Sequence, residues 1–137
     1  MRTLHFGLRV ADLDRSLAFY KAVGYEVVGT VPETPLGVLT MLKLPRDEFV
    51  TIELVHNPAE GVDSPGTGLS HFVIQVESME AAIAELCARG VDAEAPDSHG
   101  SDDFFTTWIV DPDGNRIELV QWPAGHADGM TAADMVD

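Results

Sequence analysis

The sequence HFGLRVADLDRSLAFYKAVG at residues 5–24 returns as HFVIQVESMEAAIAELCARG at residues 71–90, and this repetition decides the fold. The two stretches align without a gap at an offset of 66 residues, and six aligned positions are identical. Chance would supply roughly one identity over such a length. The similarity continues later in each half, where TIELV at 51–55 corresponds to RIELV at 116–120. The chain therefore contains two copies of one module.

Each copy begins with a stretch in which apolar and polar residues alternate, which predicts a β-strand. An apolar stripe of helical period follows, with Asp12 or Ser78 as the expected N-cap and Gly24 or Gly90 just beyond the last turn. Three more strands are expected in each half, at 25–31, 38–44 and 49–56 and then at 91–95, 104–110 and 115–121. The pattern predicts an α+β fold of two tandem βαβββ modules whose curled sheets surround a site.

The repeat also sets the expected domain boundaries. The first module covers residues 1–57 and the second covers 69–121. Residues 58–68 are rich in Pro and Gly and form the expected linker. Residues 122–137 form a C-terminal tail with no counterpart in the first module.

Composition excludes several partners and compartments. Eight Lys and Arg stand against 23 Asp and Glu, and the formal net charge of −15 argues against nucleic acid and against an anionic membrane surface. No apolar stretch approaches the roughly 18 residues of a membrane span, and the N-terminus lacks the pattern of a signal peptide. Cys87 is the single cysteine, so no internal disulfide is possible. A cytoplasmic protein is expected.

The strand faces turned away from the helices carry a repeated set of metal-ligand residue types. Each module places one His on its first strand and one Glu on its last, and alternation puts both on the same face. The set is His5, Glu53, His71 and Glu118. Imidazole and carboxylate together suit a borderline divalent ion, and four such ligands leave positions open for water or substrate. A single His or Glu on a half-exposed strand is usually only solvated, but the doubled arrangement indicates a catalytic metal site.

Other polar and aromatic residues allow two interpretations. Arg9 shares the face of His5 and Asn57 shares that of Glu53, so either residue is a candidate for binding an anionic group. A solvated arginine and an asparagine that caps the linker are the alternatives. The aromatic residues of 104–108 are expected either to wall an apolar pocket or to join the core. No ligand role is expected for His56, His99, His126 or Cys87.

The sequence resembles the vicinal oxygen chelate superfamily and, within it, glyoxalase I of the short bacterial type. The resemblance covers about 1–121 and rests on LHFGLRVADLDRSLAFY, TIELVHN, GLSHFVIQV and DPDGNRIELV. It implies metal ligation by His5, Glu53, His71 and Glu118, and contact of Arg9 and Asn57 with the glutamyl end of glutathione. It also implies a homodimer in which each site takes His5 and Glu53 from one chain and the other two ligands from its partner.

By the same resemblance, the expected reaction converts the hemithioacetal of a 2-oxoaldehyde and a thiol into a 2-hydroxyacyl thioester through an enediolate. Glu118 would be the base and Glu53 would stay bound or return the proton. Ni²⁺ or Co²⁺ is favoured over Zn²⁺. Another enzyme on this scaffold (an epimerase, an extradiol dioxygenase or a thiol transferase) remains an alternative, as does a binding protein of the bleomycin-resistance type.

The sequence departs from the family pattern in one loop. The family places a basic residue before the seventh strand to meet the glycyl carboxylate of glutathione, but residues 97–105 read DSHGSDDFF. Asp102 and Asp103 stand where a cation is expected. A glutathione adduct is therefore expected to bind poorly, unless an arginine from elsewhere (residue 2, 46 or 89) restores the contact.

Overall fold

A computed structural model describes residues 1–60 and 68–135, and the chain divides into two compact units. The first unit comprises Met1–Leu69 together with Asp111–Asn115. The second comprises Ser70–Val110 together with Arg116–Asp137. None of the described helices is long and apolar enough to cross a membrane.

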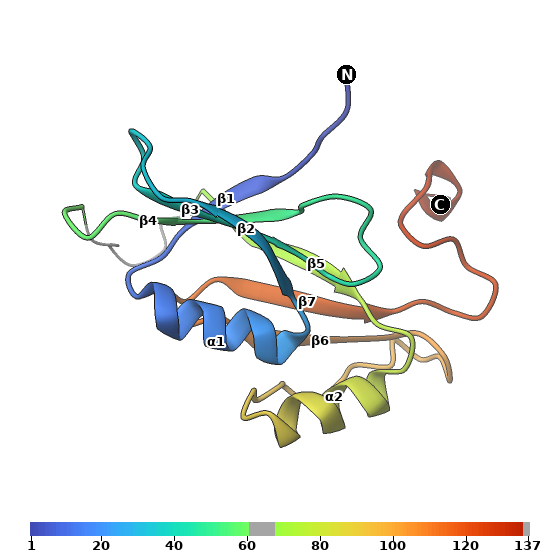
Figure 1. The fold of residues 1–137 in the computed structure, drawn as a ribbon. Coiled ribbons are helices and arrows are strands. Elements are labelled where there is room, and N and C mark those ends of the chain that lie inside the picture. The colour runs from blue at the N-terminus through green and yellow to red at the C-terminus, as the bar shows by residue number, and fades with distance from the viewer. Residues whose placement is uncertain (61–67, 136–137) are drawn as a thin grey trace. The chain divides into compact units, whose positions relative to one another are not determined.

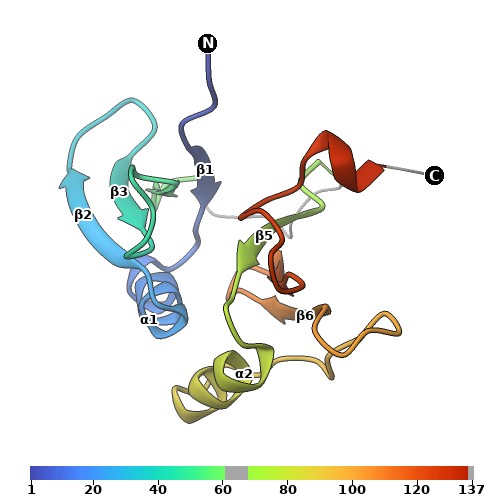
Figure 2. The ribbon, with the colours of Figure 1, turned by 90° about the vertical axis from the view of Figure 1, so that its right-hand side faces the viewer.

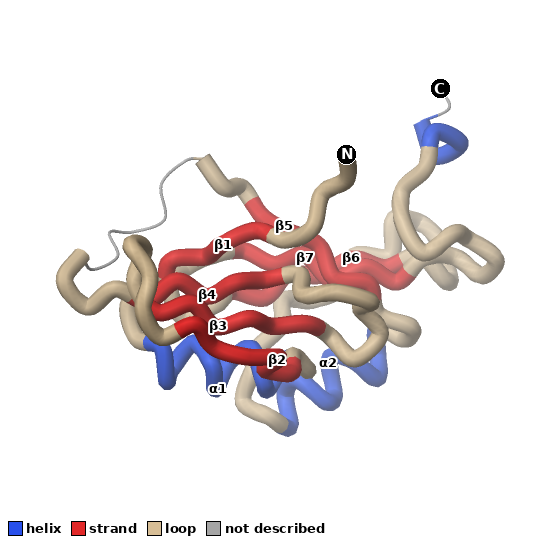
Figure 3. The backbone as a smooth tube through the Cα atoms, turned by 45° about the horizontal axis from the view of Figure 1, so that its top comes forward, coloured by secondary structure: helices blue, strands red, loops and turns tan. Residues whose placement is uncertain are grey.

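The first unit has the predicted βαβββ order. Its elements are β1 (Phe6–Arg9), α1 (Leu13–Val23), β2 (Glu26–Val31), β3 (Val38–Lys43) and β4 (Ile52–His56). The strands form one sheet in the order β1-β4-β3-β2, in which β1 runs parallel to β4 and the other neighbours are antiparallel (Figure 3). Helix α1 lies against one face of this sheet (Figure 1). The crossover through α1 is what allows β1 and β4 to pair in parallel.

Local sequence signals set the limits of α1 as predicted. The Asp12 side chain accepts the Arg15 N–H, which satisfies one of the free donors of the first turn. Gly24 ends the helix with a φ of 126°, a conformation that costs glycine little. Tyr20 on this helix and Leu42, Ile52 and Leu54 on the sheet are all almost completely inaccessible to solvent.

The turn between the last two strands of the chain belongs to the first unit. The Asp111 carboxylate accepts hydrogen bonds from the backbone N–H groups of Asp113 and Asn115, and Tyr20 Oη donates to it at 2.6 Å. Asp113 accepts from Ser16 Oγ on α1 in the same way. These contacts give α1 a polar role that its apolar stripe alone does not predict.

The second unit contains β5 (His71–Gln75), α2 (Met79–Ala88), β6 (Phe105–Val110), β7 (Arg116–Gln121) and the 3₁₀ helix η1 (Ala132–Met135). Its sheet has the order β5-β7-β6, with β5 parallel to β7 and β6 antiparallel to it. Figure 2 shows α2 beneath this sheet. The Ser78 side chain caps α2 by accepting the Ala81 N–H, and Gly90 follows the helix with a φ of 80°, both as predicted.

The strand predicted at 91–95 is wrong. The Glu94 N–H donates to the Trp108 carbonyl and Thr107 Oγ1 donates to the Glu94 carbonyl, but no continuous ladder forms. Only an isolated bridge between Asp97 and Thr106 extends the contact. Asp is a poor strand former, and Pro96 has no N–H to donate, so the pairing is interrupted where a ladder would need to continue.

Two predicted segments lie at the edge of what the structure describes. Residues 61–67 of the expected linker lie outside the described residues, so the boundaries of the linker stay a prediction. The C-terminal tail is described to residue 135 and belongs to the second unit.

Candidate functional site

The first unit brings His5 and Glu53 together. His5 directly precedes β1, and the parallel register places Gly7 opposite Glu53 on β4. His5 Nε2 lies 3.2 Å from Glu53 Oε2, with the two side chains 36% and 14% exposed. Because Ile52 and Leu54 are buried beneath the helix, alternation turns Glu53 to the opposite face of the sheet.

The second unit repeats this arrangement with His71 and Glu118. His71 opens β5, and the register pairs Val73 with Glu118 on β7. His71 Nε2 lies 3.6 Å from Glu118 Oε2. On the other side of the ring, His71 Nδ1 lies 2.9 Å from Ser70 Oγ, an outer contact that fixes the imidazole so that Nε2 faces the carboxylate.

Both pairs fit a divalent metal ion. Two ligand atoms bound to one ion at about 2.1 Å lie about 3.0–3.4 Å apart for octahedral to tetrahedral angles. The separations of 3.2 and 3.6 Å are close to this range. Each unit supplies only two donors, and residues 1–60 and 68–135 contain no group of three or more candidate ligands. The four-residue ligand set expected from the resemblance would need a pair from each module.

The face of the second sheet that carries His71 and Glu118, called here the second site face, also presents an aromatic ring and a cation. Trp108 on β6 is directly opposite Glu118 on β7. Its ring meets the His71 ring edge-on, with the centroids 5.0 Å apart. The Arg116 guanidinium lies over the Trp108 ring at 4.2 Å from its centroid. Trp108 therefore walls the site instead of joining the core.

No role was expected for Arg116 from the sequence. Strand alternation did place it on the face of Glu118, two residues away, so the signal was present. What the sequence does not show is the stacking on Trp108, because that contact joins two strands. The register also makes Arg116 the neighbour of His71 on the parallel strand.

Arg9 and Asn57 are engaged within the first unit. Arg9 Nη1 donates to Glu60 Oε2 at 2.6 Å. The Asn57 side chain accepts the Ala59 N–H and its carbonyl accepts the Glu60 N–H, so Asn57 shapes the turn that presents Glu60 to Arg9. This is the turn-capping role that the sequence offered as the alternative for Asn57. Their predicted contact with substrate stays a prediction.

The acidic loop at 97–105 is tied to the C-terminal tail by Asp103. One carboxylate oxygen accepts from Ser101 Oγ and the other from the Ala124 N–H, and these bonds lower the pKa of Asp103. Gln121 Nε2 donates to the Asp103 carbonyl. Asp103 therefore has a structural role and is not simply a loose acid facing the site.

Four stacked aromatic rings also join the loop at 97–105 to the C-terminal tail. Consecutive members are His99, Phe104, Trp122 and His126. His126 has the Ala127 carbonyl at one ring nitrogen and the Asp134 carboxylate at the other, and these acceptors raise its pKa. Both histidines thus have packing roles in this stack.

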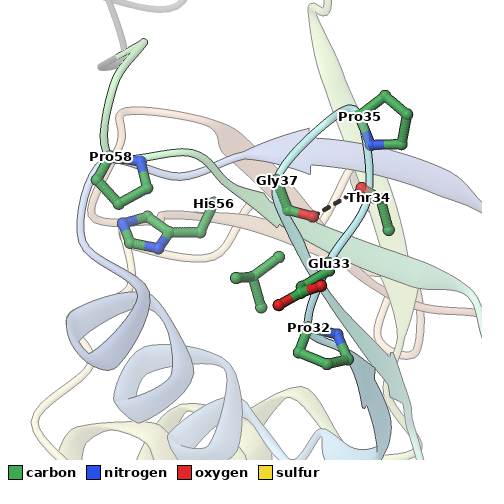
Figure 4. Close-up of a pocket in the computed structure, with 8 residues that line it drawn as sticks. Pro32, Glu33, Thr34, Pro35, Gly37, His56 and Pro58 are labelled. Carbon is green, nitrogen blue, oxygen red and sulfur yellow. Dashed lines mark hydrogen bonds between the residues drawn. The ribbon is translucent and has the colours of Figure 1, made fainter.

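A hollow of about 470 Å³ opens elsewhere on the first unit, between the β2–β3 connection and the end of β4. Figure 4 shows Glu33 and His56 beside it, among Pro32, Pro35 and Pro58. None of the four predicted ligands lines this hollow. It is therefore separate from the His5–Glu53 pair, and His56 is a wall residue of the hollow.

A family model described as Glyoxalase/Bleomycin resistance protein/Dioxygenase superfamily matches residues 2–119. The chain belongs to this superfamily. Among curated relatives, a lactoylglutathione lyase of Escherichia coli O157:H7 is 32% identical over 126 residues, covering 88% of this chain and 93% of the relative. A lactoylglutathione lyase of Salmonella typhimurium is 34% identical over 128 residues, with the same coverage of both chains.

Solved structures agree with this assignment. The trypanothione-dependent glyoxalase I of Leishmania major superposes with a TM-score of 0.71 at 30% identity, covering 88% of this chain and 86% of that one. An antibiotic-binding protein of Streptomyces, TnmS3, shares the fold with a TM-score of 0.67 at 22% identity, covering 90% of this chain and 98% of that one. The resemblance stated from the sequence is confirmed at the level of family and fold.

Proposed function

We propose that this protein is a metal-dependent lyase of the glyoxalase I type. Its substrate would be the hemithioacetal of a 2-oxoaldehyde and a thiol, and its product a 2-hydroxyacyl thioester. The observation that carries the proposal is the pair of His–Glu contacts at repeat-equivalent positions in the two units. The relatives named lactoylglutathione lyase support the same reaction class.

His5, Glu53, His71 and Glu118 would hold the metal ion, with Ni²⁺ or Co²⁺ favoured and Zn²⁺ possible. When bound, such an ion supplies Lewis-acid stabilisation of the charge that develops on two neighbouring substrate oxygens. The residues of the chain supply the rest. Glu118 accepts the proton from the carbon that bears oxygen and sulfur, and Glu53 or Glu118 returns a proton to the neighbouring carbon.

Outer contacts on the second site face keep these side chains in place. Ser70 fixes the His71 ring from behind, and Trp108 blocks its lateral movement. Trp108 lies directly opposite Glu118 on the neighbouring strand.

The homodimer expected from the resemblance is part of the proposal. Each site would take His5 and Glu53 from one chain and His71 and Glu118 from the other. The two His–Glu contacts support a site that takes one pair from each module, and the assignment of the two pairs to different chains is carried over from the resemblance.

Metal analysis and subunit mixing test the proposal together. The His5→Ala and His71→Ala variants should each lose stoichiometric metal and activity with methylglyoxal and glutathione. After the two variants are unfolded and refolded as an equal mixture, half of the dimers contain both chains, and each of these has one intact site. About a quarter of wild-type activity should return. Full metal retention in His71→Ala contradicts the ligand assignment, and no recovery on mixing contradicts the shared site.

A further inference from the structure

The second site face offers a cation that the acidic loop at 97–105 lacks. Arg116 on β7 neighbours His71 on β5 and lies two residues from Glu118. Its guanidinium lies over the face of Trp108, whose edge meets the His71 ring. One indole ring therefore contacts both a proposed metal ligand and an arginine.

Arg9 and Arg116 differ in how firmly a neighbouring carboxylate holds the guanidinium group. Arg9 donates to Glu60 at 2.6 Å, a short charge-assisted hydrogen bond. Arg116 lies 3.8 Å from Glu94, which is beyond hydrogen-bond distance, and both side chains are at least half exposed. An exposed ion pair of this length contributes little, so an incoming anion can replace Glu94 at low cost.

The aromatic platform prepares Arg116 for this role. A guanidinium over the face of an indole is held by the ring while its N–H groups stay available to an anion. This geometry suits a carboxylate, which guanidinium binds with two parallel hydrogen bonds. Less side-chain entropy remains to be lost when the anion binds, because the stacking already restricts the rotamers.

We propose that Arg116, held on Trp108, is the substrate-specificity residue of the site and binds a carboxylate on the thiol part of the hemithioacetal. The protein would then prefer thiols that bear a carboxylate over their neutral analogues, although its loop at 97–105 is acidic. This inference rests on the proposed function for the reaction, but the contact itself is a binding property of the second site face. Arg116 would then restore the missing charge, and it is none of the three arginines (Arg2, Arg46 and Arg89) that the sequence suggested for this contact.

Kinetics with a matched pair of substrates test the proposal. The hemithioacetals of methylglyoxal with glutathione and with glutathione diethyl ester differ in the charge of their carboxyl groups. In Arg116→Gln, KM for the glutathione adduct should rise about 10-fold, with kcat within twofold, while KM for the ester adduct stays unchanged. Arg116→Lys keeps the charge and should recover most of this loss.

Two further variants make the comparison specific. Arg89→Gln is a closely matched control, because Arg89 is 49% exposed and lies 3.8 Å from Glu85, whereas Arg116 is 50% exposed and lies 3.8 Å from Glu94. It should leave both KM values unchanged. Glu94→Gln removes the competing carboxylate and should lower KM for the glutathione adduct two- to fivefold. An equal change for both substrates in Arg116→Gln, or no change for either, overturns the proposal.

Failure of the lyase reaction itself is distinguishable from failure of this inference. If wild-type protein turns over neither adduct, calorimetric titration with S-methylglutathione and its diethyl ester replaces the kinetics. Tighter binding of the charged probe that disappears in Arg116→Gln supports the role of Arg116 even though the proposed reaction has failed. Equal affinity of wild-type protein for the two probes refutes it.

Discussion

Replacing Tyr20 by phenylalanine tests whether the turn at 111–115 stabilises the first unit. Tyr20 is completely buried, and its hydroxyl donates to Asp111 at 2.6 Å. Asp111 is 4% exposed and also accepts from the backbone of Asp113 and from the backbone and side chain of Asn115. The variant removes one donor from a buried carboxylate and leaves the ring in place.

The expected loss follows from the charge of the acceptor. A hydrogen bond to a charged group contributes about 1.5–3 kcal/mol, and the phenyl ring keeps the packing of Tyr20. The free energy of unfolding should therefore fall by about 2 kcal/mol, and the melting temperature by roughly 6–12 °C for a chain of this size. Urea titrations at one fixed protein concentration measure this change, because a dimer makes stability depend on concentration.

Tyr25→Phe is the matched control. Tyr25 is 6% exposed and its ring meets that of Tyr20 edge-on, so both variants remove a hydroxyl from neighbouring buried rings. Only Tyr20 donates to Asp111, and Tyr25→Phe should cost less than half as much. The reasoning is refuted if Tyr20→Phe lies within about 0.5 kcal/mol of wild type, or if the two variants lose equal stability.

Three further predictions follow from other parts of the chain. Glu118→Gln should keep the fold and most of the bound metal but lose turnover, because an amide coordinates through oxygen yet takes no proton near neutral pH; metal analysis beside initial rates checks this. Burial raises the pKa of both Tyr20 and Tyr25, so these tyrosines ionise at lower pH in the unfolded chain than in the folded one. The free energy of unfolding should therefore fall as the pH rises above about 10, by about 1.4 kcal/mol per pH unit for each tyrosine. Absorbance at 295 nm should accordingly show tyrosinate only when far-UV circular dichroism shows unfolding. Gly37→Ala should destabilise by more than about 1 kcal/mol, because φ is 111° and a Cβ would clash with the His56 carbonyl, whereas Gly29→Ala, with open space around it, should not.

The repeat made much of the fold predictable. Because the duplication has no gap, the strand and helix patterns occur twice in the sequence and support each other. The limits of both helices could be predicted from Asp12, Ser78, Gly24 and Gly90, because capping is a local interaction. The strand expected at 91–95 failed for the opposite reason. Its apolar residues resemble those of the first module, but whether a ladder forms depends on the partner strand and on Pro96, which has no counterpart in the repeated pattern.

The candidate site was predictable where it depended on alternation. Which face His5, Glu53, His71 and Glu118 occupy follows from period 2, and the structure brings them together as two pairs. Contacts that join different elements were not predictable. The pairing of Arg9 with Glu60 and the stacking of Arg116 on Trp108 depend on side-chain positions that no local pattern fixes.

The two kinds of site residue also differ in symmetry, and this difference separates their roles. His and Glu occur at equivalent positions in both modules, as expected if one ion needs a pair from each. Arg116 and Trp108 have no such counterparts, because Thr51 precedes the first-module Glu53 by two residues and Met41 lies opposite it. A metal ion can be bound by equivalent residues from both modules, whereas a substrate whose two ends differ needs different residues at each end of its binding site. Changes at the repeated positions should therefore remove metal, and changes at Arg116 or Trp108 should alter the choice of thiol while the metal stays bound.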